Sequence, residues 1–167
     1  MAFEFITIEK HKGYAIVSID RGDGINALSR QLMREITQAA ESFIDDLDTT
    51  AIILRGTDKI FSAGAALKDP EGNTNKNGRL IERRHALKIG PDMCGAWEKL
   101  EQVTICAMEG FVVGGGSALA MACDWRISGE SSHMRLPEIP LAMNMSWHSI
   151  PRIVRAIGPA KAKLYTI

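Results

Sequence analysis

Residues 111–130 read FVVGGGSALAMACDWRISGE and place three consecutive glycines directly before an apolar run of good helix formers. Glycine costs roughly 0.5–1 kcal/mol relative to alanine inside regular structure, so three in a row indicate a place that side chains would obstruct. The first N–H groups of a helix are unpaired and carry partial positive charge. The run therefore predicts a phosphate cradle, a close helix-to-strand crossing, or donors for an oxyanion that develops during a reaction.

The residues around the glycines argue against a nucleotide cradle. A P-loop carries a lysine after its glycines, and a dinucleotide-binding turn has the pattern G-x-G-x-x-G. Here Gly114-Gly115-Gly116 is followed by Ser117-Ala118-Leu119, which matches neither pattern. Tight packing and a functional site both stay open for this stretch taken alone.

Strands and helices alternate on both sides of the glycine run. The β-rich segments 3–9 and 14–20 flank His11-Lys12-Gly13 and predict an opening hairpin, and Ser29 is a candidate N-cap. Further strands are expected at 49–57, 104–109, 126–128 and 133–136, helices at 30–46, 80–101, 116–123, 147–157 and 159–166, and an exposed, mobile loop at 69–79. This alternation predicts an α/β fold with βα connections.

Composition sets the class of protein. With 167 residues, 46% of them apolar and 24% charged, the chain can bury one ordinary core, so a single domain over residues 1–167 is expected. Twenty acidic side chains balance twenty basic ones, which gives no sign of a nucleic-acid or membrane surface. No apolar run approaches the length of a membrane span, and the N-terminus lacks a signal-like segment, so a cytoplasmic location is expected.

The cysteines and histidines indicate no metal site. Cys94, Cys106 and Cys123 lack CxxC spacing, and the four histidines are scattered. Reduced thiols are therefore expected, and Cys123 is expected to be unreactive because nothing nearby in the sequence would lower its pKa.

A second loop has the same design as the glycine run. Ser62-Ala63-Gly64-Ala65-Ala66 follows the apolar strand AIILRG, as the glycines follow TICAME, and both loops lead into a helix. If the two strands are neighbours, amides of both loops can converge on one point. An acyl oxyanion needs such a pair of donors, each typically worth about 2.7–4 kcal/mol in the transition state.

The chain, with these two loops among its motifs, resembles the crotonase, or enoyl-CoA hydratase/isomerase, family. The resemblance rests on INAL at 25–28, FSAGAALK at 61–68, EGFVVGGGSALAMACD at 109–124 and RLPEIPLAMN at 135–144, in the family's order and spacing. It implies a crotonase-like spiral of repeated ββα units and a coenzyme A thioester substrate, with no permanently bound cofactor. It assigns the oxyanion to the amides of Ala65 and Gly115, the acid/base role to Glu138, and contacts with CoA to Asn26, Ala27, Leu28, Ala63, Ala65 and Leu67.

Three departures from the family pattern bear on the reaction. Ala118 stands where hydratases carry a second glutamate, Ser146 replaces a glycine that helps to seat water, and Ala66 replaces an aspartate. Adding water across a double bond is harder with one carboxylate than with two, whereas a single base can carry a proton between carbons. The expected function is an acyl-CoA enzyme of the hydratase/isomerase type with one glutamate. A catalytically silent acyl-CoA-binding or scaffold homologue, and an acyl-CoA hydrolase or decarboxylase, stay open as alternatives.

Other side chains have simpler interpretations. Trp147, Met143 and Met145 are expected in the core or in a pocket wall, His148 as an ordinary helix residue, and Asp124 in a local structural hydrogen bond. Family members usually continue into helices that cover CoA and build a trimer. The resemblance therefore implies a core that lacks its C-terminal helical part, apolar side chains exposed on the last helices, and a homo-oligomer, either a trimer or a hexamer.

Overall fold

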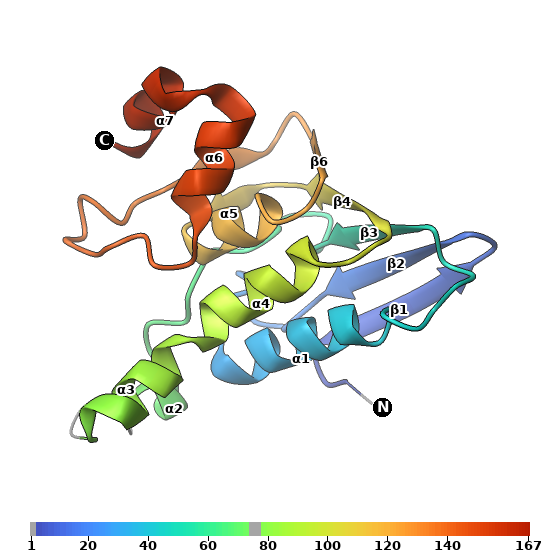
Figure 1. Cartoon of the computed structure of the whole chain (residues 1–167), viewed down its shortest axis with the longest axis horizontal. Helices are drawn as coiled ribbons and strands as arrows, with labels where there is room; N and C mark the ends of the chain where they lie inside the picture. The colour runs from blue at the N-terminus through green and yellow to red at the C-terminus, as the bar shows by residue number, and fades with distance from the viewer. Residues whose placement is uncertain (1–2, 74–77) are drawn as a thin grey trace.

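A computed structural model of the chain describes residues 3–73 and 78–167 (Figure 1). Its larger sheet has five strands in the order β1-β2-β3-β4-β6. Strand β1 (Ile6–His11) pairs antiparallel with β2 (Tyr14–Ile19), which confirms the predicted hairpin. The strands β3 (Ala51–Arg55), β4 (Val103–Met108) and β6 (Trp125–Ser128) then add in parallel.

A smaller sheet lies beside the first. It consists of β5 (Phe111–Val113) and β7 (His133–Arg135), paired in parallel, and Ser62 bridges to Val112. Strand β5 was not among the predicted strands. The chain turns between β4 and β5 at Gly110, where φ is +54° and a side chain would overlap the carbonyl of Lys59.

Two strands followed by a helix recur along the chain, as expected for a spiral of ββα units. The pattern is seen in β1-β2-α1, in β4-β5-α5 and in β6-β7-α6, with α1 at Arg30–Glu41, α5 at Gly115–Ala120 and α6 at Ser149–Ile157. The α/β expectation is confirmed. Helix α1 lies beside α4 (Ile89–Glu98) across one face of the larger sheet, and the main hydrophobic core fills the space between them (Figure 1).

The start of α1 follows the sequence prediction, but its end does not. The Ser29 hydroxyl accepts a hydrogen bond from the Leu32 N–H at 3.2 Å, so the predicted N-cap is confirmed. The helix ends at Glu41 instead of residue 46, and the hydroxyl of Ser42 donates to the carbonyl of Ala39 at 2.7 Å. This side-chain bond competes with continuation of the helix.

The single helix predicted over residues 80–101 is wrong, because the segment forms two helices. Helix α3 (Leu80–Leu87) and α4 are separated at Lys88. Pro91 has no N–H for the carbonyl of Leu87, and its ring would clash with that carbonyl in a continuous helix. The predicted loop at 69–79 is also partly helical, since Pro70–Asn73 form the single turn α2. Residues 74–77 of that loop lie outside the described part of the chain.

The C-terminal helices lie together at one end of the molecule (Figure 1). Helix α6 begins at Ser149, after His148 with a left-handed φ of +58°, and α7 spans Pro159–Thr166. A second, small apolar cluster joins Leu136, Ile153 and Ala162. Ile157, Leu164 and Ile167 are exposed, as predicted for the last helices. The assignment of residues 1–167 to one domain stays a prediction.

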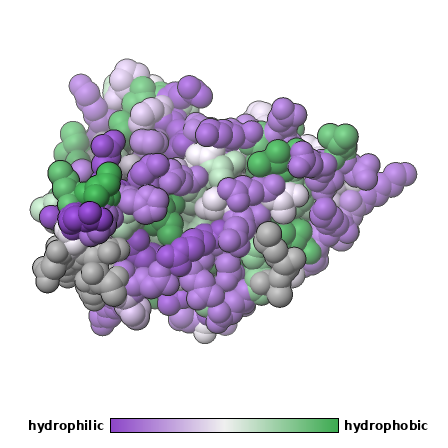
Figure 2. All heavy atoms as spheres, turned by 60° about the horizontal axis from the view of Figure 1, so that its bottom comes forward, coloured by the Kyte–Doolittle hydropathy of each residue, from purple (hydrophilic) through white to green (hydrophobic). Residues whose placement is uncertain are grey.

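On the face in Figure 2, apolar residues form small separate groups among hydrophilic ones. Among the described residues, no helix is both long and apolar enough to cross a membrane.

Candidate active site

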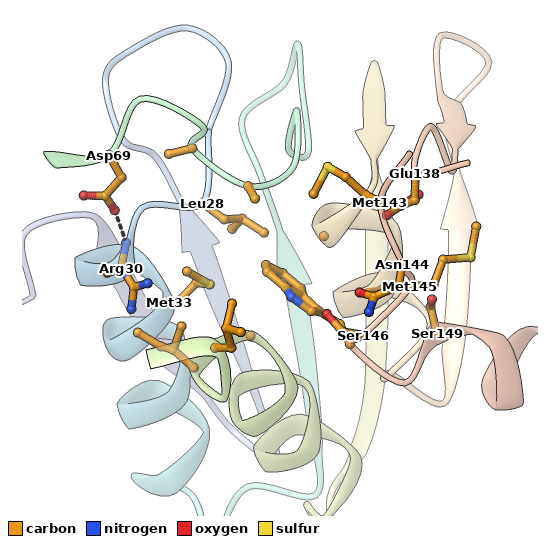
Figure 3. A pocket seen from close by; sticks show the side chains of 18 of the residues that line it. Leu28, Arg30, Met33, Asp69, Glu138, Met143, Asn144, Met145, Ser146 and Ser149 are labelled. Carbon is orange, nitrogen blue, oxygen red and sulfur yellow. Dashed lines mark hydrogen bonds between the residues drawn. The ribbon is translucent and has the colours of Figure 1, made fainter. Parts of the chain in front are cut away.

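A cavity of about 290 Å³ lies between the α1–α4 side of the molecule and the segment that precedes α6. Leu28, Arg30, Met33 and Asp69 lie on one side of it, and Glu138 and Met143 lie on the other (Figure 3). Its wall also contains residues of the two small-residue loops, of helices α4 and α5 and of the segment before α6: Ala65, Ala66, Gly90, Gly115, Ala118 and Trp147. Segments far apart in the sequence therefore share one space.

The two small-residue loops touch each other at this cavity. Strands β3 and β4, which precede them, are parallel neighbours, as the convergence of the loops requires. At Gly64, with φ +89°, an added Cβ would lie 2.6 Å from the carbonyl oxygen of Val113 and 3.4 Å from the nitrogen of Gly115. The loops are held in place by Ser62, whose carbonyl accepts from the Val113 N–H and whose hydroxyl accepts from the Gly64 N–H.

Each loop contributes one unpaired amide to the cavity wall. In the first loop, the N–H of Gly64 is bonded to Ser62 and that of Ala66 to the carbonyl of Leu28 at 3.0 Å. In the second, the N–H of Gly114 is bonded to the carbonyl of Arg135 at 2.9 Å. The amides of Ala65 and Gly115 donate to no protein acceptor within residues 3–73 and 78–167. Both residues line the cavity.

Glu138 brings a carboxylate to the same wall. It follows β7 and the buried Leu136, and its Oε1 would lie 3.3 Å from a Cβ on Gly114, so the carboxylate rests against the glycine run. Its Oε2 is buried and has no hydrogen-bond partner in the described structure. A buried polar atom without a partner is costly, which makes this oxygen the clearest sign of a binding function at the site.

The other carboxylate in the described wall is already occupied. Asp69 accepts hydrogen bonds from the N–H of Arg30 at 2.6 Å and from the N–H of Glu71 at 2.9 Å (Figure 3). Ala118 also lines the cavity and supplies no acid. Glu138 is therefore the one lining carboxylate, among the residues described, with an oxygen that has no hydrogen-bond partner.

The residues that the resemblance assigns to CoA contacts do not all lie in the cavity wall. Leu28 and Ala65 line the cavity. Asn26 is buried, with its side chain bonded to the Arg21 N–H and to the carbonyls of Ile19 and Phe61, so it supports the loop internally. Outside the lining, Ala27 is buried, Ala63 is half-buried and the side chain of Leu67 is exposed. A role in binding CoA stays a prediction for all of these residues.

The segment before α6 supplies an aromatic part of the wall. Trp147, Met143 and Met145 line the cavity, which confirms their interpretation as core or pocket wall. Sequence reasoning missed Met33, Ile89 and Gly90, which reach the cavity from α1 and α4. The Gly90-Pro91 pair inside a helical pattern was the available signal, because proline there marks a helix boundary.

Groups outside the cavity have structural roles. Asp124 accepts from the N–H and hydroxyl of Thr104 at 2.8 and 2.9 Å, as predicted for a local hydrogen bond. All three cysteines are buried free thiols, and burial raises the pKa of Cys94 to about 12. Among the described residues, no group of histidine, cysteine and carboxylate side chains could hold a metal ion.

Comparison with known proteins gives a consistent result. A protein-family model described as Enoyl-CoA hydratase/isomerase matches residues 9–167. The chain is 36% identical over 165 residues to "Probable enoyl-CoA hydratase" of Mycobacterium tuberculosis, covering 97% of this chain and 60% of that protein. It is 34% identical over 169 residues to a crotonyl-CoA hydratase of Syntrophomonas wolfei, covering 99% and 63%.

Solved structures agree with the sequence matches. The crystal structure of an enoyl-CoA hydratase from Bacillus anthracis superimposes with a TM-score of 0.87 at 30% identity, covering 98% of this chain and 62% of that one. The chain thus spans about 60% of the length of the proteins that it matches.

Proposed function

The chain belongs to the enoyl-CoA hydratase/isomerase family, and on this basis we propose that its cavity binds an acyl-CoA thioester and moves a proton on the acyl group. One observation carries the proposal. The unpaired amides of Ala65 and Gly115 and the partnerless carboxylate oxygen of Glu138 belong to the wall of one cavity.

The two amides act on the thioester carbonyl. Removing a proton from Cα leaves an electron pair that spreads onto the carbonyl oxygen, and the resulting enolate is unstable in water. Donors that are already in place stabilise this charge without reorganising during the reaction. The neighbouring amides of Gly64, Ala66 and Gly114 are bonded to protein acceptors. The loops are therefore held in place, and Ala65 and Gly115 offer fixed donors for that oxygen.

Glu138 carries the proton. As a carboxylate it takes the proton from Cα of a 3-enoyl thioester, and as a carboxylic acid it returns that proton to Cγ, which moves the double bond to the 2,3 position. No further reactant is needed, because the proton removed from Cα is the one returned to Cγ and the double bond only changes its position. One carboxylate is sufficient for this isomerisation, and in the described wall Asp69 is occupied and Ala118 supplies no acid.

Hydration of a 2-enoyl thioester is the second candidate. It is favoured by the names of the relatives, which are hydratases. In that reaction Glu138 would have to take a proton from water and also supply the proton to Cα, because position 118 lacks a carboxylate. Hydrolysis and decarboxylation of an acyl-CoA would use the same oxyanion site, and binding of acyl-CoA without turnover would indicate a silent homologue.

Several features of the whole protein belong to the proposal. The only cofactor required is the coenzyme A portion of the substrate, and the protein acts as a homo-oligomer. The CoA portion runs along the first small-residue loop and the segment before α1, past the residues that the family resemblance suggested as contacts: Asn26, Ala27, Leu28, Ala63 and Leu67.

Substitution of Glu138 tests the proposed reaction. General acid–base catalysis typically contributes about 10²–10⁴-fold, so Glu138→Gln should lower turnover by that amount while acyl-CoA binding is retained. The protein would be incubated separately with a 2-enoyl-CoA and a 3-enoyl-CoA, and products would be followed by chromatography. Double-bond migration identifies an isomerase, and a 3-hydroxyacyl product identifies a hydratase.

The matched control is Glu130→Gln, because Glu130 is an exposed glutamate outside the cavity. Equal activity of wild type and the Glu138 variant would show that the base is wrong. If calorimetry detects no binding of any acyl-CoA, the proposed function fails altogether.

A further inference from the structure

The indole of Trp147 lies between two glycines that belong to different helices. A Cβ on Gly90 of α4 would overlap Cε2 of the indole and would lie 2.5 Å from Cζ2 and 2.6 Å from Cδ2. A Cβ on Gly115 of α5 would lie 2.7 Å from Cη2 and 3.0 Å from Cε3. The six-membered ring therefore contacts both backbones, and only glycine at both positions leaves room for it.

Hydrogen bonds from Arg152 hold the backbone of Trp147 in place. The guanidinium of Arg152 donates from Nη1 to the carbonyl of Trp147 at 3.0 Å and to that of His148 at 3.2 Å. The same guanidinium donates from Nε and Nη2 to the carboxylate of Glu98 on α4, at 3.1 and 2.7 Å. Helix α4 thus holds Trp147 at two points, through Gly90 and through the Glu98–Arg152 pair.

The position of the ring matters because Gly115 is one of the two proposed oxyanion donors. An acyl chain whose carbonyl oxygen is bound at Ala65 and Gly115 leaves the carbonyl carbon next to the indole. The cavity of about 290 Å³ also lies just below the usual range for ligand pockets, roughly 300–1,000 Å³. The pantetheine arm of CoA must share that space, which leaves little room for a long chain.

Resting on the proposed function, we propose that Trp147 closes the acyl end of the cavity and restricts the substrate to acyl-CoA thioesters with a short acyl chain. Trp147 acts here as a specificity-determining residue. The ring blocks the space between α4 and α5 into which a longer chain would extend, and it takes no part in proton transfer.

The test compares wild type with Trp147→Ala and Trp147→Phe on enoyl-CoA substrates with acyl chains of four, eight and twelve carbons, with kcat/KM measured for each. The wild type should prefer the shortest chain. A change of even one methylene group in an apolar pocket alters kcat/KM by roughly 10–200-fold, so Trp147→Ala should raise the ratio of the eight-carbon to the four-carbon substrate at least about tenfold. The smaller phenyl ring of the Phe variant should give an intermediate shift.

Trp125→Ala is the matched control. Trp125 lies on β6, is 67% exposed and does not line the cavity, so its removal should leave the chain-length preference unchanged. Calorimetry with saturated acyl-CoA thioesters of the same lengths repeats the comparison without turnover.

The outcomes separate the two proposals. The inference is overturned if the wild type binds and turns over long chains as well as short ones, or if the two Trp147 variants keep the wild-type preference while they still bind acyl-CoA. If the alanine variant does not fold, the phenylalanine variant and the wild-type series decide. Absence of acyl-CoA binding by the wild type would instead remove the proposed function, and the inference with it.

Discussion

Gly64 shows how a single residue sets the geometry of the candidate site. Its φ of +89° lies in a region that L side chains rarely adopt, and its Cα faces the carbonyl of Val113 in the other loop. On either side of this contact, the N–H of Ala63 is hydrogen-bonded and the N–H of Ala65 has no protein acceptor in the described structure. The position of the Ala65 amide therefore depends on the absence of a side chain at residue 64.

Gly64→Ala should damage both stability and activity. A non-glycine residue in this conformation costs about 1–3 kcal/mol, and the added Cβ also forces the loops apart. Displacing the amide of Ala65 should lower turnover by roughly 10²-fold, since a misplacement of about 1 Å at a reacting group has that effect. Urea unfolding and steady-state kinetics measure the two changes.

The control is Gly95→Ala in α4, where an added Cβ meets no atom within 4 Å. Alanine is favoured over glycine in a helix by about 1 kcal/mol, so this variant should be as stable as wild type or more stable. A fully active and stable Gly64→Ala protein would mean that the loop contact does not position the amide.

At the scale of elements, the cap of α1 supports the segment that carries the cavity residues Arg30 and Met33. Ser29 satisfies the N–H of Leu32, and it is buried, so water does not replace it easily. The residues before it run along the first small-residue loop, where the N–H of Leu28 donates to the carbonyl of Gly64 at 2.8 Å. The start of α1 and the first small-residue loop are thus joined.

Ser29→Ala should lower the free energy of unfolding by about 1 kcal/mol, within the usual range of about 0.5–2 kcal/mol for loss of an N-cap. Ser29→Thr retains the hydroxyl and should recover most of the loss. Urea denaturation of the three proteins provides the measurement, and equal midpoints for wild type and the alanine variant would contradict a role for the cap.

The break between α3 and α4 could not be recognised from the periodicity of the sequence. Both halves are good helix formers, so the segment reads as one helix, although Pro91 cannot accept the geometry of a continuous one. Because α4 starts anew at Ile89, Gly90 occupies its first turn and meets the indole of Trp147. The break therefore allows the contact between Gly90 and Trp147 in the cavity wall.

Across the whole molecule, the Glu98–Arg152 pair joins α4 to α6. The hydrogen bonds from Arg152 lower the pKa of Glu98, against the opposing effect of burial. Burial is the largest effect on Arg152, whose side chain is 8% exposed, and it works against the charged form, but the hydrogen bonds that Arg152 donates to Glu98 and the attraction of that carboxylate together raise the pKa of the guanidinium. The pair links the C-terminal helices to the main core.

The lowered pKa of Glu98 predicts a dependence of stability on pH. A group with a lower pKa in the folded state stabilises the fold above its ordinary value near 4.5, and this stabilisation is lost as the pH falls through the folded pKa. Thermal unfolding should show a decline in Tm below about pH 4.5, and Glu98→Gln should have a lower Tm at neutral pH and a shallower decline.

Part of the decline should persist in that variant. Hydrogen bonds from Lys10 and Thr49 lower the pKa of Asp46 to about 2, so its contribution is lost only at lower pH. Glu101→Gln, at an exposed glutamate of the same region, is the control. An unchanged pH profile in Glu98→Gln would show that the ion pair contributes nothing measurable, as is common for partly exposed pairs.

The sequence by itself determined the features that depend on near neighbours in the chain. Alternating strands and helices, the hairpin around Gly13, the cap at Ser29 and the two small-residue loops all follow from local periodicity, backbone freedom and capping. The same local patterns, in their order and spacing, indicated the family and the candidates Ala65, Gly115 and Glu138.

Only the tertiary structure decided which of these groups meet. The pairing of β3 with β4 brings Gly64 against the glycine run, the segment after β7 places the carboxylate of Glu138 beside Gly114, and the break before α4 lets Trp147 lie between Gly90 and Gly115. These contacts join residues distant in the chain. They depend on how the elements pack in three dimensions, and local residue preferences carry no information about that packing.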